Sequence, residues 1–533
     1  MEFACQIEIA DRMGPDGSLL LVKGWAFAKS GETLDSIRLA GNAGVELGYY
    51  GIPRPDVGDA FGGNSQARFS GFSFLTPRGD SFIPCSIEVA GTNGTWHKIA
   101  DLTTARRQPA RPAAAAHIEL GAGPRADSTV SAVKTRSAKM PDAGPVLFIS
   151  HDHASAGSQL LLLRLLRWLR EKRDLSFDIL IAVPRAGAVH ASEAEKHILS
   201  GFESCARVYF LSDLTQAPEN LALIRAGYYR LIYANTSTLG WLLPSLRPFS
   251  CPVISHVHEL GFWIERRTGL PVFQRQMAGS NRVIACSTPV RDYLVREGGV
   301  PPEKLVVIHA CGSMERARTV SQDNDRATVR HDLGIPAGAF VVAACGTFDW
   351  RKGAELFVPI CVALRRKLGG KDFRAVWIGD YGTTIVRDQF AHEVKTVGLA
   401  GKVELLGPQR DPLRLMLAAD CFALPSREDP FPLVMLEAGT LGLPIVGFQD
   451  SGGVTEFVGS DAGIIVPYLD LESFAEALSL LARDPVLARR LGDAARQRAT
   501  QLFDEEVSFR RIAELIVTVQ AGAPATTGRL PRS

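Results

Sequence analysis

The residues best suited to chemistry lie in one segment of the C-terminal half, SREDPFPLVMLEAGTLGLPIV at 426–446. Asp429 and Glu437 are eight positions apart, which is about two helical turns plus a residue, so both carboxylates can face one cleft. Carboxylates accept hydrogen bonds from pairs of sugar or ribose hydroxyls. Pro430 is expected to open a helix here, because its missing N–H is not needed in a first turn. The free N–H groups of that turn suit a phosphate.

A second segment, CGTFDWRKGAELF at 345–357, supplies positive charge. A strand is expected to end at Gly346, and Lys352 is expected at the start of a helix. Arg351 and Lys352 can bind a phosphate and stabilise its negative charge. A solvated basic turn is the better explanation of an Arg-Lys-Gly sequence that stands alone. Its position directly after a strand favours the phosphate site instead.

A third group of candidates follows two other expected strands. His256 and His258 in ISHVHEL (254–260) project to the same side of a strand, so metal binding has to be considered. No third ligand has a recognisable spacing, and we therefore expect no metal site. Packing of a buried histidine is the alternative to a functional role. Gly157 in SHDHASAGSQ (150–159) lets the backbone approach a ligand closely.

The composition limits the class of protein. The 533 residues indicate about three or four domains. Apolar residues make up 46% and charged residues 22%, which excludes a wholly disordered or collagen-like chain. Because 59 Lys and Arg face 57 Asp and Glu, no nucleic-acid partner is expected. No apolar run is long enough to span a membrane, and the first residues do not resemble a secretory signal. Nine scattered cysteines without a CxxC pair favour free thiols in a reducing cytosol.

Three segments differ from the rest in their pattern. Residues 1–104 contain short β-forming runs separated by Gly, Pro, Asn and Asp, which predicts a small all-β, sandwich-like domain. Residues 105–142 lack periodicity and are rich in Ala, Pro and Arg, which is typical of a flexible basic linker. Contact with anionic lipid headgroups is the second interpretation of the linker. A disordered tail is expected at 521–533.

Apolar runs alternate with helical stretches from residue 143 to residue 520, and this alternation predicts parallel sheets. A polar stretch after residue 314 separates two series of runs. We therefore expect an α/β architecture of two Rossmann-like domains, at 143–314 and 315–520, with a ligand cleft between the carboxyl ends of their sheets. The expected strands are 145–150, 177–183, 208–211, 231–234, 253–256, 282–286 and 305–309, then 340–345, 375–378, 403–406, 421–424, 444–447 and 463–466.

The sequence DPFPLVMLEA at 429–438 resembles the Glu-x7-Glu signature of the retaining GT-B nucleotide-sugar glycosyltransferases, also called glycosyl transferases group 1 or family 4. The resemblance implies that Glu437 binds the ribose of the donor. Asp429 stands where the family has its first Glu, and it is expected to contact hydroxyls of the donor sugar. Glu428 next to it could take over that role. Phe431 and Leu433 are expected to line the donor site.

The cationic segment resembles the donor diphosphate site of the same family. Lys352 matches the phosphate-binding lysine. The usual Arg after Gly346 is replaced by Thr347, and the adjacent Arg351 could compensate. WIGDYG, with Gly379, resembles a segment that lines the nucleotide pocket in the family.

Three further segments resemble parts of the family's active site. FQDSGGVTEF resembles the G-G-x-x-E segment, which implies that the amides of Gly452 and Gly453 lie near the donor phosphates and sugar. ISHVHEL resembles the H-D or H-E element, with His258 and Glu259 as the better match and His256 as the second. The resemblance places this histidine near the reacting sugar and the acceptor. Gly157 matches one glycine of a Gly-Gly loop that contacts donor or acceptor.

The N-terminal domain resembles a small β module fused to bacterial polysaccharide-assembly enzymes, through GWAF, YGIPRPDVGDAF and SGFSF. Its ligand is left open. Trp25, Tyr49, Tyr50 and Trp96 could stack on sugars, and core packing explains these aromatic residues at least as well.

These features together predict an enzyme that moves a sugar from a nucleotide diphosphate donor to a saccharide or lipid-linked acceptor, in bacterial surface polysaccharide or glycan assembly. The resemblance implies retention of configuration, a nucleotide-sugar co-substrate and no other cofactor. A cytoplasmic location is expected, with the inner face of the membrane as an alternative because of the basic helix at 160–173. A core helix with a solvated basic face also explains that segment.

Two other functions stay open. A sugar-nucleotide epimerase or hydrolase on the same fold would consume donor without acceptor, and a non-catalytic scaffold would bind nucleotide at best. A dinucleotide dehydrogenase is disfavoured, because no GxGxxG follows a first strand.

Overall fold

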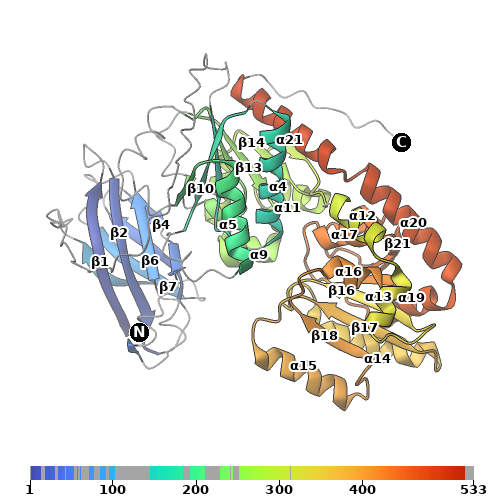
Figure 1. Ribbon diagram of the computed structural model, residues 1–533. Helices are drawn as coiled ribbons and strands as arrows, with labels where there is room; N and C mark the ends of the chain where they lie inside the picture. Colours follow the sequence, from blue (N-terminus) through green and yellow to red (C-terminus); the bar gives the residue numbers. More distant parts are fainter. Residues whose placement is uncertain are drawn as a thin grey trace, which may run out of the picture. The chain divides into compact units, whose positions relative to one another are not determined.

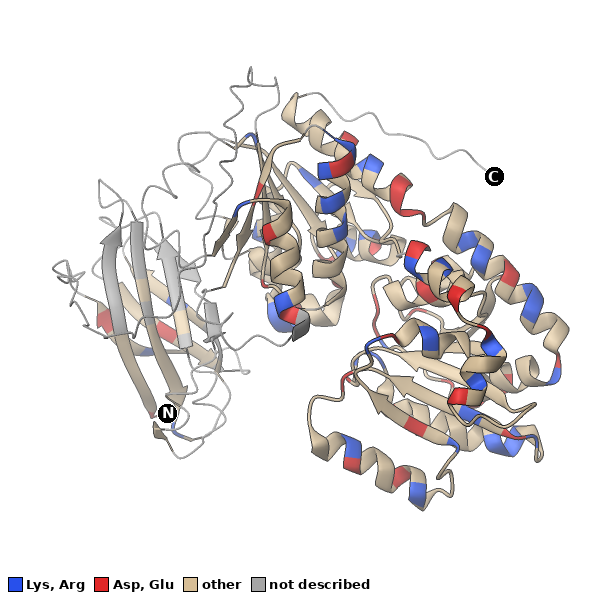
Figure 2. Ribbon diagram, viewed as in Figure 1, with Lys and Arg blue, Asp and Glu red and all other residues tan. Residues whose placement is uncertain are grey.

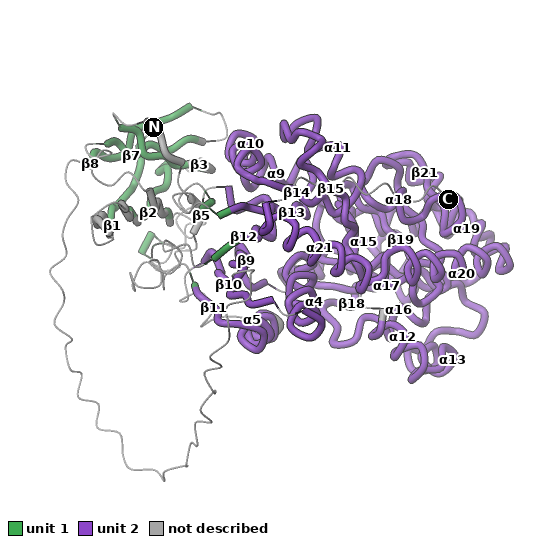
Figure 3. Tube along the Cα trace, turned by 90° about the horizontal axis from the view of Figure 1, so that it is seen from above, with its two compact units in different colours: residues 1–144, 210–230, 241–251 green, residues 145–209, 231–240, 252–533 purple. Residues whose placement is uncertain are grey.

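The computed structural model describes most of the chain (Figure 1). The described residues are 2–13, 19–30, 34–41, 44–47, 49–52, 57, 60–61, 71–76, 85–91, 95–102, 145–154, 156–173, 175–183, 193–210, 229–240, 242–243, 251–312 and 314–522. The expected linker at 105–142 and most of the expected tail lie outside them. The chain divides into two compact units (Figure 3). The first contains residues 1–144, 210–230 and 241–251, and the second contains residues 145–209, 231–240 and 252–533.

The described strands of the first unit form two four-stranded sheets with antiparallel pairings, ordered β1-β2-β6-β5 and β4-β3-β7-β8. The strands are β1 (Phe3–Met13), β2 (Leu19–Ala28), β3 (Leu34–Gly41), β4 (Gly44–Leu47), β5 (Tyr49–Ile52), β6 (Gly71–Thr76), β7 (Cys85–Gly91) and β8 (Trp96–Leu102). Val22 and Phe72 from one sheet share a buried cluster with Ile37, Ile87 and Val89 from the other. The predicted all-β region is therefore confirmed. The β-forming runs at 6–10, 19–25, 36–39, 72–75, 85–89 and 96–99 predict six of these strands, and the sequence pattern missed β4 and β5.

Two of the aromatic candidates for sugar stacking pack inside this unit. The Trp25 ring centroid lies 6.0 Å from that of Phe27 and 5.7 Å from that of Phe61. The guanidinium of Arg38 lies 4.1 Å from the centre of the Trp96 ring. The side chains of Tyr49 and Tyr50 lie outside the described part of the chain. Packing within the unit thus accounts for both tryptophans.

The second unit contains two parallel sheets, which confirms the predicted pair of Rossmann-like domains. The sheet orders are β11-β10-β9-β12-β13-β14-β15 and β18-β17-β16-β19-β20-β21. The strands of the first sheet are β9 (Val146–Ser150), β10 (Phe177–Ile181), β11 (Val208–Phe210), β12 (Leu231–Ala234), β13 (Val253–Val257), β14 (Arg282–Ala285) and β15 (Leu305–Val307). Those of the second are β16 (Phe340–Cys345), β17 (Phe373–Ile378), β18 (Val403–Gly407), β19 (Cys421–Leu424), β20 (Ile445–Phe448) and β21 (Gly463–Val466). Strands such as β9 and β19 are buried at every residue, as expected for strands covered on both faces.

Helices cover the faces of both sheets (Figure 1). The described helices of the first domain are α4 (Gly157–Lys172), α5 (Glu193–Cys205), α9 (Gly261–Arg267), α10 (Leu270–Gly279) and α11 (Thr288–Arg296). Those of the second are α12 (Met314–Asp323), α13 (Arg326–Asp332), α14 (Phe357–Leu368), α15 (Thr384–Thr396), α16 (Pro412–Leu417), α17 (Leu433–Thr440), α18 (Val454–Val458), α19 (Leu471–Arg483), α20 (Pro485–Gln501) and α21 (Glu505–Gln520).

Each sheet has one point at which strand order reverses. In the first sheet it lies between β9 and β12, and in the second between β16 and β19. The connections that leave such a pair of strands depart to opposite faces, so a crevice opens at the carboxyl ends of the strands. The residues that follow these four strands begin at 151, 235, 346 and 425. The fold therefore places the Gly157 loop, the cationic turn and the acidic loop at the edges where ligands bind, and the histidine segment lies at the carboxyl end of β13, the strand next to β12.

Two expected helix boundaries were wrong. Pro430 was expected to open a helix, but α17 begins at Leu433, directly after Pro432, and Asp429 stays in the loop. The single helical stretch expected at 485–520 is broken at residues 502–504. Phe503 is buried there, and the Asp504 side chain accepts hydrogen bonds from the N–H groups of Glu506 and Val507 to start α21. The break has a physical reason, because it lets the chain leave the second domain and return to the first.

Helix α21 packs on α4 of the first domain. The Trp168 indole donates to Glu506 Oε2 at 2.6 Å, and Arg511 donates to the carbonyl of Val307 at 2.9 Å. Arg164 donates to both oxygens of Glu505, at 3.1 and 2.6 Å. It also donates to the carbonyls of Cys311 and Gly312, at 3.0 and 2.5 Å. The hydrogen-bonding groups of the Arg164 guanidinium are thus occupied by partners within the protein.

The charges of the described surface are mixed. Arg167 and Arg170 of α4 are exposed, and both α20 and α21 carry Arg together with Asp or Glu (Figure 2). Within the described residues, no helix is both long and apolar enough to cross a membrane. All nine cysteines are free thiols, as expected.

Replacing Arg164 by Ala is expected to lower the free energy of unfolding by about 2 kcal/mol, because the change leaves Glu505 and two carbonyl groups without their donor. Thermal unfolding of the purified protein measures the effect. Arg167→Ala, on the exposed side of the same helix, is the matched control and should leave the melting temperature unchanged. Equal melting temperatures for the two variants would contradict the assignment.

Candidate active site

An ion pair lies at the reversal point of the second sheet. Lys352 Nζ is 2.5 Å from Asp429 Oδ2, and Arg351 NH1 is 3.7 Å from Asp429 Oδ1. Asp429 is only 5% exposed. Two cations therefore hold one buried carboxylate. The cations belong to the turn after β16, and the carboxylate belongs to the loop after β19. The structure brings together the three charged residues that the sequence proposed separately.

Backbone contacts hold the turn and the loop against each other. Asp349 Oδ1 accepts the Lys352 N–H at 2.8 Å, and the Arg427 N–H donates to the carbonyl of Arg351 at 2.8 Å. Gly353 has φ +66°, and a Cβ at this position would lie 1.9 Å from the Pro425 carbonyl oxygen. Only glycine allows the turn to approach the loop this closely.

The expected donor-site glycines make close backbone contacts. Gly452 forms a parallel bridge with Asp429, and a Cβ on Gly452 would lie 1.9 Å from the Asp429 carbonyl oxygen. The Gly453 N–H donates to the same carbonyl at 3.1 Å. Gly379 has φ +145°, and its Cβ would lie 2.1 Å from the Gly346 carbonyl oxygen. These glycines therefore position the backbone that carries Asp429 and the turn after β16.

Glu437 lies on α17, eight residues after Asp429 in the chain. Burial raises the pKa of its carboxyl to about 6, and the charges of Arg164 and Arg316 only partly oppose that rise. Among the described residues, no hydrogen bond reaches this carboxylate. A shielded carboxylate without a protein donor is an acceptor available to ligand hydroxyls.

The histidines occupy the carboxyl end of β13. The His256 and His258 ring centroids are 3.9 Å apart, and His256 Nδ1 lies 2.7 Å from the Tyr233 hydroxyl. Burial lowers the pKa of His256 well below its usual value, and burial lowers the pKa of His258 to about 4. Both rings are therefore neutral at pH 7. His258 Nε2 lies 3.2 Å from Asn235 Oδ1, which makes Nε2–H the donor and leaves Nδ1 as an acceptor.

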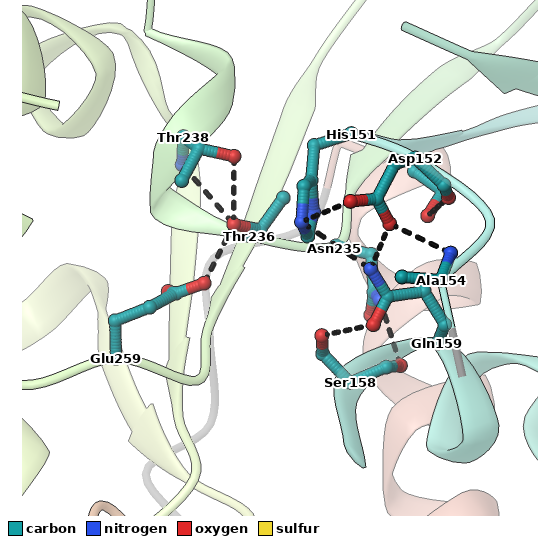
Figure 4. A network of polar contacts seen from close by, with 10 residues as sticks. His151, Asp152, Ala154, Ser158, Gln159, Asn235, Thr236, Thr238 and Glu259 are labelled. Carbon is teal, nitrogen blue, oxygen red and sulfur yellow. Dashed lines mark hydrogen bonds and ion pairs between the residues drawn. The ribbon is translucent and has the colours of Figure 1, made fainter. Parts of the chain in front are cut away.

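Glu259 positions the backbone at this edge. It accepts hydrogen bonds from Thr236 Oγ1 at 2.6 Å and from the N–H groups of Ser237 and His258, both at 3.1 Å. Figure 4 shows Glu259 facing Thr236. Both carboxylate oxygens of Glu259 thus accept hydrogen bonds within the protein. Glu259 holds in place the segments that follow β12 and β13.

Several polar residues of the first domain were missed by the sequence reasoning. Asp152 accepts hydrogen bonds from the Ala154 N–H, at 3.0 Å, and from the Gln159 amide, and His151 Nε2 lies 3.3 Å from Asp152 Oδ2 (Figure 4). Burial raises the pKa of Asp152, but the hydrogen bonds from His151, Ala154 and Gln159 lower it by a larger amount. The pKa of Asp152 is therefore below its usual value. Asn235 was missed as well. The available signal was the position of these polar residues directly after β9 and β12.

The side chains of three other predicted site residues have different surroundings. Phe431 is buried, and the centroid of its ring lies 5.3 Å from that of His309 and 5.2 Å from that of Phe503. Thr347 is exposed beyond β16. The Glu428 carboxylate turns toward α9 of the first domain.

The two domains approach each other at helix starts. A Cβ on Gly157, at the start of α4, would lie 3.7 Å from Leu433 Cδ1, at the start of α17. The first turns of both helices therefore border the same space between the sheets. Among the described residues, no group of three or more His, Cys, Asp or Glu side chains is placed to hold a metal ion.

Two family sequence models match the part of the chain that contains the two Rossmann-like domains. The model described as glycosyl transferases group 1 matches residues 325–498, and the model described as glycosyltransferase family 4 matches residues 147–311. Together they cover more than half of the chain. The protein is a group 1 glycosyltransferase.

Relatives of this glycosyltransferase are about a quarter identical to it over the half of the chain that they match. The D-inositol 3-phosphate glycosyltransferase of Saccharomonospora viridis is 27% identical over 318 residues, which are 56% of this chain and 71% of the relative. The protein of the same name from Corynebacterium diphtheriae is 26% identical over 281 residues, which are 50% of this chain and 65% of the relative.

Solved structures share the GT-B fold. HepE from Anabaena in complex with UDP-glucose superposes with a TM-score of 0.59 at 22% identity, covering 70% of this chain and 100% of that one. Sucrose-phosphate synthase from Thermosynechococcus elongatus superposes with a TM-score of 0.57 at 22% identity, covering 71% and 100%. Both comparisons support the arrangement of two Rossmann-like domains.

The raised pKa of Glu437 predicts a pH dependence of donor binding. Hydroxyl groups donate to the ionised carboxylate, so affinity for a nucleotide-sugar should be full from about one pH unit above this pKa and should fall as the pH drops through about 6. Titration calorimetry between pH 5 and pH 8 measures this dependence, because a nucleotide-sugar diphosphate does not itself ionise in that range. Glu437→Gln should bind more weakly without the pH dependence. An unchanged pH profile in Glu437→Gln would contradict the role of this carboxylate.

Proposed function

We propose that this glycosyltransferase moves a sugar from a nucleotide diphosphate donor to a saccharide or lipid-linked acceptor with retention of configuration, in bacterial surface polysaccharide or glycan assembly. The observation that carries the proposal is one juxtaposition. At the carboxyl edge of the second sheet, Arg351 and Lys352 lie beside Asp429, and α17 presents the Glu437 carboxylate without a protein donor. Cations suit a diphosphate, and carboxylates suit sugar and ribose hydroxyls.

The cations have the central role in this mechanism. A nucleoside diphosphate leaves with additional negative charge, and fixed cations beside it lower the energy of the transition state. Lys352 would then be shared between the diphosphate and Asp429, while Asp429 accepts hydrogen bonds from the donor sugar. We propose that transfer needs no divalent cation, because Arg351 and Lys352 supply the positive charge. The first-turn N–H groups of α4 and α17 would add to it.

The first domain would contribute the acceptor side. His258 is neutral, its Nε2–H is directed to Asn235, and its Nδ1 remains an acceptor for a substrate hydroxyl. The departing phosphate would take the proton of the attacking hydroxyl, so that no protein base is required. The names of the relatives make D-inositol 3-phosphate the first small acceptor to test.

A lipid-linked acceptor would require the enzyme to work at a membrane surface. The exposed Arg167 and Arg170 on α4 are the residues proposed to face anionic headgroups on the cytoplasmic side.

Thermal shift with a panel of nucleoside diphosphates and their sugars tests the donor site. We expect one base to raise the melting temperature, because a ligand that binds the folded state stabilises it. Glu437→Ala should lose the shift. Glu404→Ala, an exposed carboxylate on β18, is the control and should keep it. If no nucleotide shifts the wild-type protein, the proposed donor site is wrong.

Lys352→Ala should lower kcat/KM by at least about tenfold, because the leaving group loses a cation. It should also lower the melting temperature, because Asp429 would stay buried with only Arg351 at 3.7 Å. Combining it with Asp429→Asn removes the unpaired charge and should restore the melting temperature without restoring activity. Full activity of Lys352→Ala would overturn its assigned role.

A further inference from the structure

The Glu428 carboxylate crosses from the second domain to the first. Its Oε2 accepts the Phe262 N–H at 3.0 Å, and its Oε1 accepts the Trp263 N–H at 3.3 Å. Both amides belong to the first turn of α9, where backbone N–H groups have no partner within the helix. Leu260, the residue that precedes this helix, provides no side-chain cap. The carboxylate from the other domain therefore supplies the acceptor that the helix lacks.

The backbone of Glu428 is tied to the cationic turn. Arg351 NH1 donates to the Glu428 carbonyl at 3.1 Å, and the Glu428 N–H donates to the Arg351 carbonyl at 3.2 Å. The next residue, Asp429, forms the ion pair with Lys352. The residue that contacts the first domain is thus bonded to one donor-site cation and adjacent to the donor-site carboxylate.

A ring contact lies beside the same hydrogen bonds. The Phe262 ring centroid is 4.8 Å from that of Trp350, the residue directly before Arg351. Burial raises the pKa of Glu428, while the two N–H donors and the charge of Arg351 only partly oppose the rise. The carboxylate is therefore shielded, and backbone amides rather than a paired cation hold its charge.

We propose that Glu428 is a positioning residue that docks α9 of the acceptor domain onto the donor loop, and so joins cleft closure to the state of the diphosphate site. This inference rests on the proposed function of that site. A diphosphate that engages Arg351 acts on the same guanidinium that holds the Glu428 carbonyl. Glu428 itself contacts neither the donor nor the acceptor in this assignment.

Hydrogen exchange of the α9 amides tests the contact directly, since the Glu428 carboxylate is the acceptor that the structure gives to the Phe262 and Trp263 N–H groups. In Glu428→Ala these amides should exchange at least about tenfold faster than in the wild-type protein. Glu428→Gln keeps one side-chain oxygen and should show an intermediate rate. Glu265→Ala is the matched control on the same helix, where Glu265 accepts a bond from the Tyr293 hydroxyl at 3.3 Å. Wild-type exchange rates in Glu428→Ala would overturn the proposal.

Kinetics separate a positioning residue from a donor ligand. Glu428→Ala should lower kcat by about tenfold while changing the dissociation constant of the nucleotide-sugar less than about threefold, and Glu428→Gln should recover part of the loss. A fall in donor affinity as large as the fall in kcat would overturn the proposal, because Glu428 would then bind the donor. An unchanged kcat would overturn it too.

The exchange measurement needs no turnover, so the two proposals can fail separately. Fast exchange in Glu428→Ala with no nucleotide shift in the wild-type protein would remove the proposed function and keep the docking contact. A nucleotide shift with wild-type exchange in Glu428→Ala would remove the docking contact and keep the donor site.

Discussion

The ion pair between Lys352 and Asp429 is the interaction on which the donor side of this glycosyltransferase depends. It joins the turn after β16 to the loop after β19, which leave the second sheet on either side of its reversal point. The glycines around it serve the same arrangement. Gly353 brings the turn against the loop, and Gly452 brings the next segment against Asp429. Charge, backbone conformation and sheet order thus concentrate the acidic and basic groups at one edge.

The first domain has a different electrostatic character. Its polar residues at the carboxyl edge are largely bonded to one another or to backbone, as Glu259 and Asp152 show. Burial keeps His256 and His258 uncharged near neutral pH. The proposed donor side therefore holds fixed charge that suits a diphosphate, whereas the proposed acceptor side holds neutral hydrogen-bonding groups. This division fits transfer of a sugar whose leaving group is the charged partner.

The sequence predicted the architecture well because the central parallel strands are buried on both faces. Apolar runs such as those of β16 and β19 have the bounds that the pattern gave. Side-chain direction could not be predicted in the same way. Phe431 and Glu428 flank Asp429 in the chain, yet one packs against His309 and the other reaches α9. Both outcomes depend on contacts between residues far apart in sequence, which no local pattern contains.

Three consecutive residues of the donor loop have partners in three directions. Arg427 contacts Trp350 and Glu355, Glu428 contacts α9, and Asp429 contacts Lys352. An inserted or deleted residue would move all three contacts out of register at once. A substitution at one of these positions changes one contact, whereas a change in the length of the connection between β19 and α17 changes all three.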